Sequence, residues 1–250
     1  MMFDLGLVSV SFRSLEPKQI AELCRENGLE YIEWGSDIHA PCTDSARISE
    51  IVELQADCGI KCSSYGTYFR IGTNEASELY SYIDAAKKLG TDILRLWCGD
   101  KNYTDMTPDE RDYIIAESKK AAKIAEECGV TLCMECHNKT FTNCLEGALE
   151  LMKSVDSPNF QMYWQPNQFR TLEENLEYPE KIAKYVKVIH VFNWEGKNKY
   201  PLCDAIEIWK KYLSFFDGSQ KLLLEFMPDG KPESLGAETA ALKEIRRELK

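Results

Sequence analysis

Apolar residues recur along the chain in two patterns that alternate. Residues 3–10 (FDLGLVSV) form a short apolar run, whereas residues 17–28 space Ile20 and Cys24 along one side of a segment that ends at Gly28. A short apolar run bounded by turn residues is typical of a buried strand, and an apolar return every three or four residues is typical of an amphipathic helix. The chain therefore begins as a strand followed by a helix.

The same strand–helix unit recurs along the whole chain. The predicted strands cover residues 3–10, 29–35, 61–67, 92–99, 131–137, 160–166, 186–193 and 221–228. The predicted helices cover residues 17–28, 44–58, 74–90, 107–129, 144–155, 171–184, 203–215 and 235–249. Units of this kind form parallel sheets, and eight of them in 250 residues predict an α/β fold, a single (β/α)8 TIM barrel.

A doubly wound open sheet is the main alternative arrangement of strand–helix units. That fold usually has fewer strands, and it often carries a glycine-rich phosphate loop after its first strand. The corresponding segment here, LGLVSVSFRS, lacks the G-x-G-x-x-G pattern. No linker or low-complexity stretch divides the chain, so we expect one barrel domain over residues 1–250.

Composition narrows the classes of partner. The net charge of −11 disfavours a general nucleic-acid or anionic-membrane binder, because neutralising phosphates requires a basic surface. Nothing in the sequence resembles a membrane span, and the N-terminal MMFDLGLVSVSF lacks the basic start of a signal peptide. We therefore expect a cytoplasmic protein that acts on a small molecule.

The ten cysteines are expected to be reduced thiols that pack as small apolar residues. Cys133 and Cys136 form a C-x-x-C pair, but positions three apart on a strand face opposite sides, and no second pair of this kind is present. This arrangement disfavours a redox or zinc-knuckle role.

Two polar residues interrupt the apolar strand at 131–137. In TLCMECHN, Glu135 and His137 are two positions apart, and such side chains share one face of a strand. Burying an ionised carboxylate costs several kcal/mol unless an opposite charge compensates it. The sequence therefore indicates that a cationic side chain or a metal ion faces Glu135.

Further polar residues gather where the other predicted strands end. The active site of a (β/α)8 barrel lies at the carboxyl ends of its strands, so these side chains are candidates for it. The set includes all three histidines of the chain. Its members are Arg13, Glu33, His39, Tyr65, Arg70, Arg95, Glu135, His137, Gln165, Asn167, Gln168, His190, Asn193 and Glu225.

Glu135, His190 and Glu225 suggest a metal site. Each interrupts an apolar strand near its end, and two carboxylates with one imidazole suit a divalent cation such as Mn²⁺, Mg²⁺, Co²⁺ or Zn²⁺. A cation would also compensate Glu135. The alternative is that each polar residue is satisfied separately by Arg95, Arg13 or backbone groups.

Four of the five tryptophans lie at or just beyond the predicted strand ends. Because neighbouring strand residues face opposite sides, Trp34 cannot face inward with Glu33, nor Trp164 with Gln165. We expect most of these tryptophans to pack between strands and helices, and we assign Trp194 as a wall of the ligand site. The four are Trp34, Trp97, Trp164 and Trp194.

These segments together resemble the xylose isomerase-like barrels, the sugar phosphate isomerase/epimerase superfamily, over essentially the whole chain. The resemblance lies in YIEWGSDIHAP, SYGTYFRIG, ILRLWCG, MECHNKTFTN, YWQPN, VIHVFNW and LLLEF. It implies one divalent metal ion (Mn, Co, Zn, Mg or Fe) held by Glu135, Gln165, His190 and Glu225. Gln165 departs from the Asp that is usual in the family. It can offer a carbonyl oxygen without a charge, so we expect weaker metal binding.

The resemblance also implies a reaction. Such enzymes remove a proton from the carbon next to a carbonyl and pass through an enediolate, which predicts a sugar isomerase or epimerase. We expect catalytic roles for Glu135, Glu225 and His137. We expect substrate-binding roles for Arg13, Glu33, His39, Tyr65, Arg95, Asn193 and Trp194.

Two other functions stay open. A lyase acting by β-elimination or dehydration on an oxidised sugar or glycoside would start with the same proton abstraction, and a sugar-binding barrel without catalysis would be consistent with Gln165. The superfamily's DNA repair endonucleases need many histidine ligands, so three histidines and a charge of −11 argue against that function. The loops NKTFTN and WEGKNK lack the sugar-binding set of ketose 3-epimerases. A homo-oligomer is possible.

Overall fold

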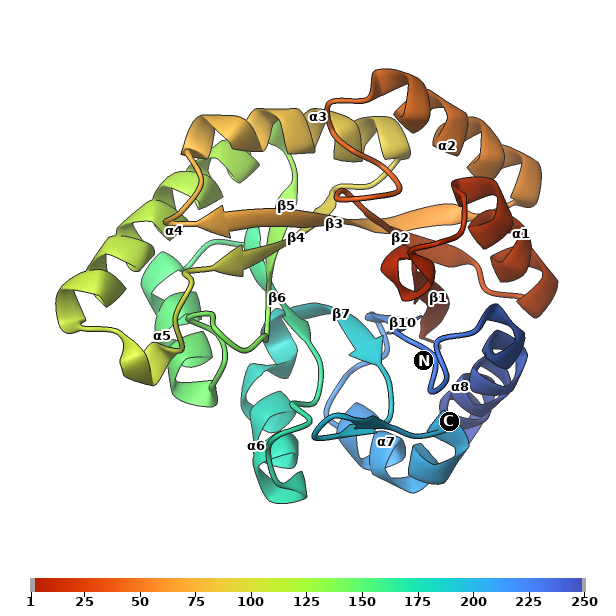
Figure 1. The fold of residues 1–250 in the computed structure, drawn as a ribbon. Helices are drawn as coiled ribbons and strands as arrows, with labels where there is room; N and C mark the ends of the chain where they lie inside the picture. The colour runs from red at the N-terminus through yellow and green to blue at the C-terminus, as the bar shows by residue number, and fades with distance from the viewer. Residues whose placement is uncertain (1–2, 249–250) are drawn as a thin grey trace.

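Eight parallel strands close into a barrel in the computed structural model, which describes residues 3–248 (Figure 1). Around the barrel the strands follow the order β1-β10-β7-β6-β5-β4-β3-β2. Eight α-helices surround them, so the prediction of a (β/α)8 barrel is confirmed. The barrel strands are β1 (Asp4–Val8), β2 (Tyr31–Gly35), β3 (Lys61–Ile71), β4 (Ile93–Cys98), β5 (Thr131–Glu135), β6 (Phe160–Trp164), β7 (Val186–Val191) and β10 (Lys221–Leu224).

The helices follow the predicted segments with shifts at their starts. Two begin later than predicted, because Ala76–Glu78 and Leu202–Ala205 form 3-10 turns before α3 and α7. The longest helix, α4, begins after Thr107, whose side chain accepts a hydrogen bond from the backbone N–H of Glu110. The helices are α1 (Pro17–Asn27), α2 (Ser45–Cys58), α3 (Leu79–Leu89), α4 (Pro108–Cys128), α5 (Leu145–Val155), α6 (Leu172–Ile182), α7 (Ile206–Leu213) and α8 (Leu235–Glu248).

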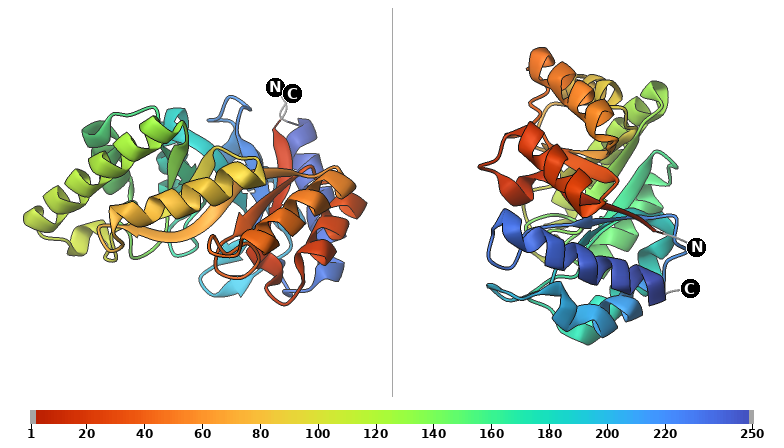
Figure 2. Two further views of the ribbon diagram at one scale, coloured as in Figure 1. Left: turned by 90° about the horizontal axis from the view of Figure 1, so that it is seen from above. Right: turned by 90° about the vertical axis from the view of Figure 1, so that its right-hand side faces the viewer.

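The ring is closed where its first and last elements meet. Helix α8 lies beside β1 and α1 in the views of Figure 2. The Arg246 side chain in α8 donates a hydrogen bond of 3.3 Å to the backbone oxygen of Phe3. None of the helices within residues 3–248 is long and apolar enough to cross a membrane.

Strand alternation divides the core into two layers. The larger layer lies between the barrel and the helices, and Trp34 and Trp164 pack there, as predicted. The Trp34 indole donates to the side-chain oxygen of Gln55 at 2.8 Å, and the Trp164 ring lies 6.1 Å from that of Trp209. A smaller apolar group that includes Tyr163 forms a separate cluster, apart from the layer that packs against the helices.

Several strands end earlier than predicted, and this changes how three polar residues are positioned. Strand β5 ends at Glu135, so His137 lies in the following loop and the shared-face argument does not apply to it. The carbonyl oxygen of Glu135 accepts a 2.6 Å hydrogen bond from the Thr142 hydroxyl in this loop. Asn193 and Glu225 likewise follow β7 and β10 instead of lying within them.

A short hairpin after β7 was not predicted. It consists of β8 (Trp194–Glu195) and β9 (Asn198–Lys199), which pair in antiparallel fashion. Gly196 turns the chain with a φ of 58°, a conformation that glycine adopts without strain, and its N–H donates to Gln168 O at 2.8 Å. The hairpin is thereby fixed to the β6–α6 loop at the carboxyl end of the barrel.

Candidate functional site

A buried ionic cluster joins three strands inside the barrel. Arg95 on β4 donates through Nε to Glu33 Oε1 on β2 at 3.0 Å, and through Nη1 to Glu135 Oε2 on β5. The side chains of these three residues are at most 5% exposed. One guanidinium thus compensates two carboxylates, which stabilises charges that would otherwise be costly to bury.

Glu33 lies beneath the open end of the barrel. Its Oε2 atom accepts hydrogen bonds from the Tyr163 hydroxyl at 2.8 Å and the Ser64 hydroxyl at 3.3 Å. Burial opposes ionisation of Glu33, but Arg95, His190 and the Tyr163 hydrogen bond together outweigh burial and lower the pKa of this carboxyl. A Cβ atom at Gly66 would lie 2.5 Å from Glu33 Oε1, so only glycine lets β3 approach the ion pair this closely.

The four side chains assigned as metal ligands converge above this cluster. One donor atom each from Glu135, His190 and Glu225 lies within 4.8 Å of the others. His190 Nδ1 is 3.4 Å from Glu135 Oε1, 3.5 Å from Glu225 Oε2 and 2.9 Å from Gln165 Oε1. The geometry therefore brings together three oxygen donors and one nitrogen donor.

The two carboxylates in this group have different surroundings. Glu135 Oε2 accepts hydrogen bonds from Arg95 and from the Trp97 indole N–H at 2.5 Å, so Oε1 is the oxygen that faces His190. Burial opposes its ionisation most strongly, but Arg95 and His190 together outweigh burial and hold the pKa of Glu135 well below its usual range. Glu225 accepts no comparable hydrogen bonds within residues 3–248, and burial together with Glu135 raises its pKa.

The charges of the cluster fit a divalent cation. Glu33, Glu135 and Glu225 carry three negative charges against the single charge of Arg95, so with a neutral imidazole the cluster has a net charge of −2. Burial favours the neutral form of His190, but Glu225 and Glu33 outweigh it and raise its pKa to about 10. Either protons or a cation must balance this excess, and the carboxylate, amide and imidazole donors suit a divalent metal.

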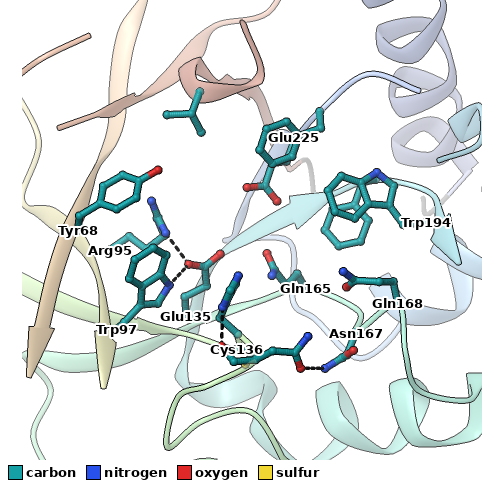
Figure 3. Close-up of a pocket in the computed structure, with 15 residues that line it drawn as sticks. Tyr68, Arg95, Trp97, Glu135, Cys136, Gln165, Asn167, Gln168, Trp194 and Glu225 are labelled. Carbon is teal, nitrogen blue, oxygen red and sulfur yellow. Dashed lines mark hydrogen bonds and ion pairs between the residues drawn. The ribbon is translucent and has the colours of Figure 1, made fainter. Parts of the chain in front are cut away.

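A cavity of about 210 Å³ opens above these donors (Figure 3). Tyr68 and Trp97 form one wall, with ring centroids 5.1 Å apart. Trp194 forms the opposite wall, packed on Phe192 at 4.9 Å and on Phe226 at 5.5 Å. Aromatic faces on both sides with carboxylates between them suit a small polar molecule that also has apolar faces. The other lining residues are Val10, Arg95, Glu135, Cys136, His137, Asn138, Gln165, Asn167, Gln168 and Glu225.

Most of the predicted site residues belong to this region. Arg95, Glu135, His137, Gln165, Trp194 and Glu225 line the cavity. Glu33 and His190 lie in the buried cluster and contact each other, with His190 Nε2 3.2 Å from Glu33 Oε2. His137 Nδ1 lies 2.7 Å from the backbone oxygen of Asn138.

Four predicted substrate-binding residues lie neither along the cavity nor in the buried cluster. Arg13 pairs with Asp37 at the surface and donates a 3.3 Å hydrogen bond to Tyr68, which lines the cavity. His39 is buried, with Nδ1 3.0 Å from the Ser9 hydroxyl, and burial lowers its pKa.

The other two face other parts of the barrel. The Tyr65 hydroxyl donates to Ala40 O at 2.5 Å, and the Asn193 amide donates to Pro201 O at 2.8 Å. Substrate-binding roles for Arg13, His39, Tyr65 and Asn193 stay predictions.

Several lining residues were not predicted, although the sequence held a signal for some. Trp97 lies two positions after Arg95 on β4, so strand alternation places both on the inner face. The Arg70 guanidinium stacks 4.5 Å from the Trp97 ring and donates to Gly99 O at 2.6 Å, which holds the indole in place. Phe226 carried no comparable signal, and its φ of 54° places this backbone in the left-handed region.

The whole chain was also compared with known protein families. The family model of the xylose isomerase-like TIM barrel matches residues 21–249. The chain belongs to this family. One relative of this xylose isomerase-like barrel is the 3-dehydroshikimate dehydratase of Bacillus anthracis, which is 23% identical over 174 residues. The match covers 65% of this chain and 60% of that relative, so it spans less than two thirds of the dehydratase.

Solved structures share the fold of this xylose isomerase-like barrel at low identity. The probable 3-DHS dehydratase AsbF of Bacillus anthracis aligns with a TM-score of 0.82 and 16% identity over 96% of this chain and 99% of AsbF. The D-psicose 3-epimerase of Clostridium cellulolyticum H10, crystallised with D-tagatose, aligns with a TM-score of 0.72 and 15% identity. The alignment covers 99% of this chain and 100% of the epimerase chain. The IOLI protein with a bound zinc atom aligns with a TM-score of 0.74 and 17% identity over 99% of this chain and 98% of the IOLI chain. Two of these similar proteins, the dehydratase and the 3-epimerase, are enzymes.

Proposed function

We propose that this protein is a divalent-metal-dependent isomerase or epimerase of an uncharged sugar or sugar derivative. The observation that carries the proposal is the convergence of Glu135, His190 and Glu225 within 4.8 Å at the base of an aromatic-walled cavity. Membership of the xylose isomerase-like family supports it. A bound metal in one structural neighbour and a ketose epimerase as another are consistent with it.

The residues that would hold the metal are Glu135 through Oε1, Gln165 through its carbonyl oxygen, His190 through Nδ1, and Glu225. When bound, the cation would polarise the substrate carbonyl and stabilise the negative charge of an enediolate. Glu33 accepts from the opposite nitrogen of His190, and this hydrogen bond would orient the imidazole with Nδ1 toward the cavity.

Glu225 is suited to move the proton. Its pKa is raised by burial, and among the described residues it has no hydrogen-bond donor comparable to those that hold Glu135. A carboxylate of raised pKa can both remove and return a proton near neutral pH. Glu135, held by Arg95 and Trp97 through Oε2 and assigned to the metal through Oε1, would mainly bind and orient, and it is the second candidate for proton transfer.

The cavity favours an uncharged substrate. Arg95 is the one Lys or Arg among its described lining residues, and both of its carboxylate partners already lie in the ionic cluster. Phosphate and carboxylate groups are usually bound by a cation that is free to pair with them. This argues against a sugar phosphate as the substrate. It also argues against 3-dehydroshikimate, the anion on which the dehydratase relative acts by its name.

A lyase is the second candidate, because that relative is named a dehydratase and its structural counterpart shares the fold. Elimination of a group two carbons from a carbonyl begins with the same proton abstraction. Product analysis by NMR separates the two reactions, since an epimerase conserves the composition of the substrate and a lyase releases water or an alcohol. A sugar binder without catalysis is the third candidate, and Gln165 is the feature that favours it.

Metal content and solvent exchange test the proposal together. We expect elemental mass spectrometry of purified, tag-free protein to find about one divalent metal ion per chain after loading. We also expect the metal-loaded protein to exchange deuterium from solvent into the carbon next to the carbonyl of an uncharged ketose, which reports proton abstraction whatever the product. If the protein binds metal but exchanges no deuterium into any tested ketose or keto-glycoside, the result would favour a sugar-binding barrel without catalysis. If the protein binds no metal, the proposal is refuted.

Gln165→Asp is expected to tighten metal binding by about tenfold, because it adds a negative charge beside three other donors and more charged ligands raise the affinity of a cation site. Isothermal titration with Mn²⁺ measures the change. Gln168→Asp is the matched control, since Gln168 lines the same cavity without contacting His190. Equal tightening in both variants would mean that the added charge acts only at long range, and would remove Gln165 from the ligand set.

Metal binding is expected to weaken as the pH falls. The pKa of His190 is raised to about 10 without metal, so the imidazole carries a proton at neutral pH that a cation must displace. The apparent affinity should fall by about tenfold per pH unit for one displaced proton as the pH is lowered below about 10. In the metal-free protein the charged imidazole stabilises the fold fully below 6.5, and this contribution is lost as the pH rises through about 10. Titrations in buffers of different ionisation enthalpy count the released proton, and a pH-independent affinity would contradict the expectation.

A further inference from the structure

A second cavity of about 360 Å³ adjoins the first. It lies between the β6–α6 loop and the segment after β7. The two cavities share four lining residues, Asn167, Gln168, Phe192 and Trp194, so they are neighbours separated by these side chains. The reaction proposed above needs only the first cavity, because all of its candidate acid–base groups lie there.

The shared wall offers polar atoms that have no partner in the protein. The indole Nε1 of Trp194 is buried and makes no hydrogen bond within residues 3–248. The side-chain amide of Gln168 also has no hydrogen-bond partner in the described part of the chain; its backbone oxygen accepts from Gly196. A buried N–H without an acceptor costs free energy, so a ligand that supplies oxygen atoms at this wall would bind favourably.

The second cavity has the composition of a site for an uncharged polar ring. Its walls combine the aromatic rings of Trp194, Trp209 and Tyr212 with the side-chain amide of Gln168 and the side-chain oxygen of Asn193, whose N–H₂ donates to Pro201 O. Aromatic faces suit the C–H faces of a sugar or an aryl group, and amides suit hydroxyl groups.

The charges at the second cavity do not indicate an anionic ligand. Its one described Lys or Arg, Arg170, donates to Asn143 O at 3.2 Å and lies 3.5 Å from Glu174. Glu195 adds a negative charge at this cavity. A phosphate or carboxylate would therefore find no unpaired cation among the described residues that line this cavity.

We propose that the second cavity binds a second uncharged ring joined to the reacting sugar, so that the substrate is a glycoside or a disaccharide and not a free monosaccharide. The inference rests on the proposed function for the first cavity and names its substrate class. Trp194, which lines both cavities, would then contact both units. The first cavity would hold the carbonyl-bearing unit over Glu135 and Glu225.

Equilibrium binding of paired probes tests the inference. Mn²⁺-loaded protein is titrated with D-fructose and with the fructose-containing disaccharides lactulose and turanose, followed by calorimetry and by the indole ¹H–¹⁵N resonance of Trp194, which Trp194→Phe assigns. We expect at least one disaccharide to bind at least tenfold more tightly than D-fructose. Equal affinities, or no binding of any probe, would overturn the inference.

A substitution that fills the second cavity tests whether the second ring of the substrate binds there. Ile208 lines only the second cavity and is 37% exposed, so Ile208→Trp should occupy that space without unfolding the chain. We expect this variant to lose the tenfold preference for the disaccharide while its affinity for D-fructose stays unchanged. Val52→Trp on α2 is the matched control, because Val52 is equally exposed and lines neither cavity.

The two proposals fail in different ways. A disaccharide preference that survives Ile208→Trp, or that is lost equally in Val52→Trp, would overturn the inference, and metal binding and deuterium exchange in the first cavity would be unaffected. Conversely, loss of metal-dependent exchange in the wild-type protein would refute the enzymatic function, while the difference between disaccharide and monosaccharide affinity would still report on the second cavity.

Discussion

Glu225→Gln is expected to lower metal-dependent deuterium exchange by about a thousandfold, within the range that a positioned acid–base group usually contributes. The same substitution should weaken metal binding, because it removes one of the three carboxylate charges that, with Arg95, give the buried cluster a net charge of −2. Glutamine keeps the size of the side chain and adds an N–H₂ donor beside His190, 3.5 Å from Glu225 Oε2. The folded structure should therefore persist while both functions are lost.

Two measurements separate the functions of Glu225. Single-turnover exchange at saturating Mn²⁺ reports proton transfer, and titration calorimetry reports the metal. Glu233→Gln, an exposed carboxylate in the loop before α8, is the matched control and should change neither. Unchanged exchange in Glu225→Gln would remove this residue from the reaction, and Glu135 Oε1 would then be the candidate base.

Arg95→Met is expected to destabilise the metal-free protein by about 3–5 kcal/mol, the cost of removing one partner from a buried ion pair. Arg95 is 4% exposed and compensates Glu33 and Glu135 together, so its loss leaves two carboxylates without a cation. For a chain of 250 residues this free energy corresponds to a fall in Tm of roughly 10 °C. Protonation of Glu33 or Glu135 would reduce the loss, so the destabilisation should shrink as the pH is lowered.

Arg47→Met is the matched control for this prediction. Arg47 also bridges two carboxylates, Glu16 and Glu50, each at 3.1 Å, but all three lie at the surface. Exposed ion pairs contribute about 0–1 kcal/mol, so its Tm should change little. Thermal unfolding of both variants with chelator present makes the comparison. Similar losses in the two variants would show that burial does not determine the value of the Arg95 pair.

A double substitution adds a second check. In Arg95→Met with Glu135→Gln, one uncompensated charge is removed, and we expect part of the lost stability to return. Additive losses would mean that Arg95 and Glu135 are not energetically coupled, contrary to the hydrogen bond between them.

The local pattern of the sequence was sufficient to predict the barrel and the group of donors at its rim. Apolar runs and helical periodicity are set by neighbouring residues, so the eight units could be found without tertiary information. Because parallel strands in a closed barrel end at one rim, Glu135, His190 and Glu225 could be placed together from their positions alone. The same alternation placed Trp34 and Trp164 in the outer layer.

The strand ends were less predictable. The strand-like pattern TLCMECH runs to His137, but β5 ends at Glu135, where the Thr142 hydroxyl, seven positions later, donates a hydrogen bond to the Glu135 carbonyl. A hydrogen bond of this kind depends on how a loop folds back, which periodicity does not encode. His137 and Glu225 consequently lie in loops, although both line the cavity.

The sequence by itself determined the number of strand–helix units, the face on which each strand residue lies, and the identity of the donors at the rim. Only the tertiary structure decided that Arg95 binds both Glu33 and Glu135, that Glu135 is held by Trp97 while Glu225 is not, and that the hairpin after β7 places Trp194 between two cavities. The physical reason is distance along the chain. Strand and helix patterns arise from contacts between near neighbours, whereas these charges and walls come from residues on different strands and loops that meet only when the barrel closes.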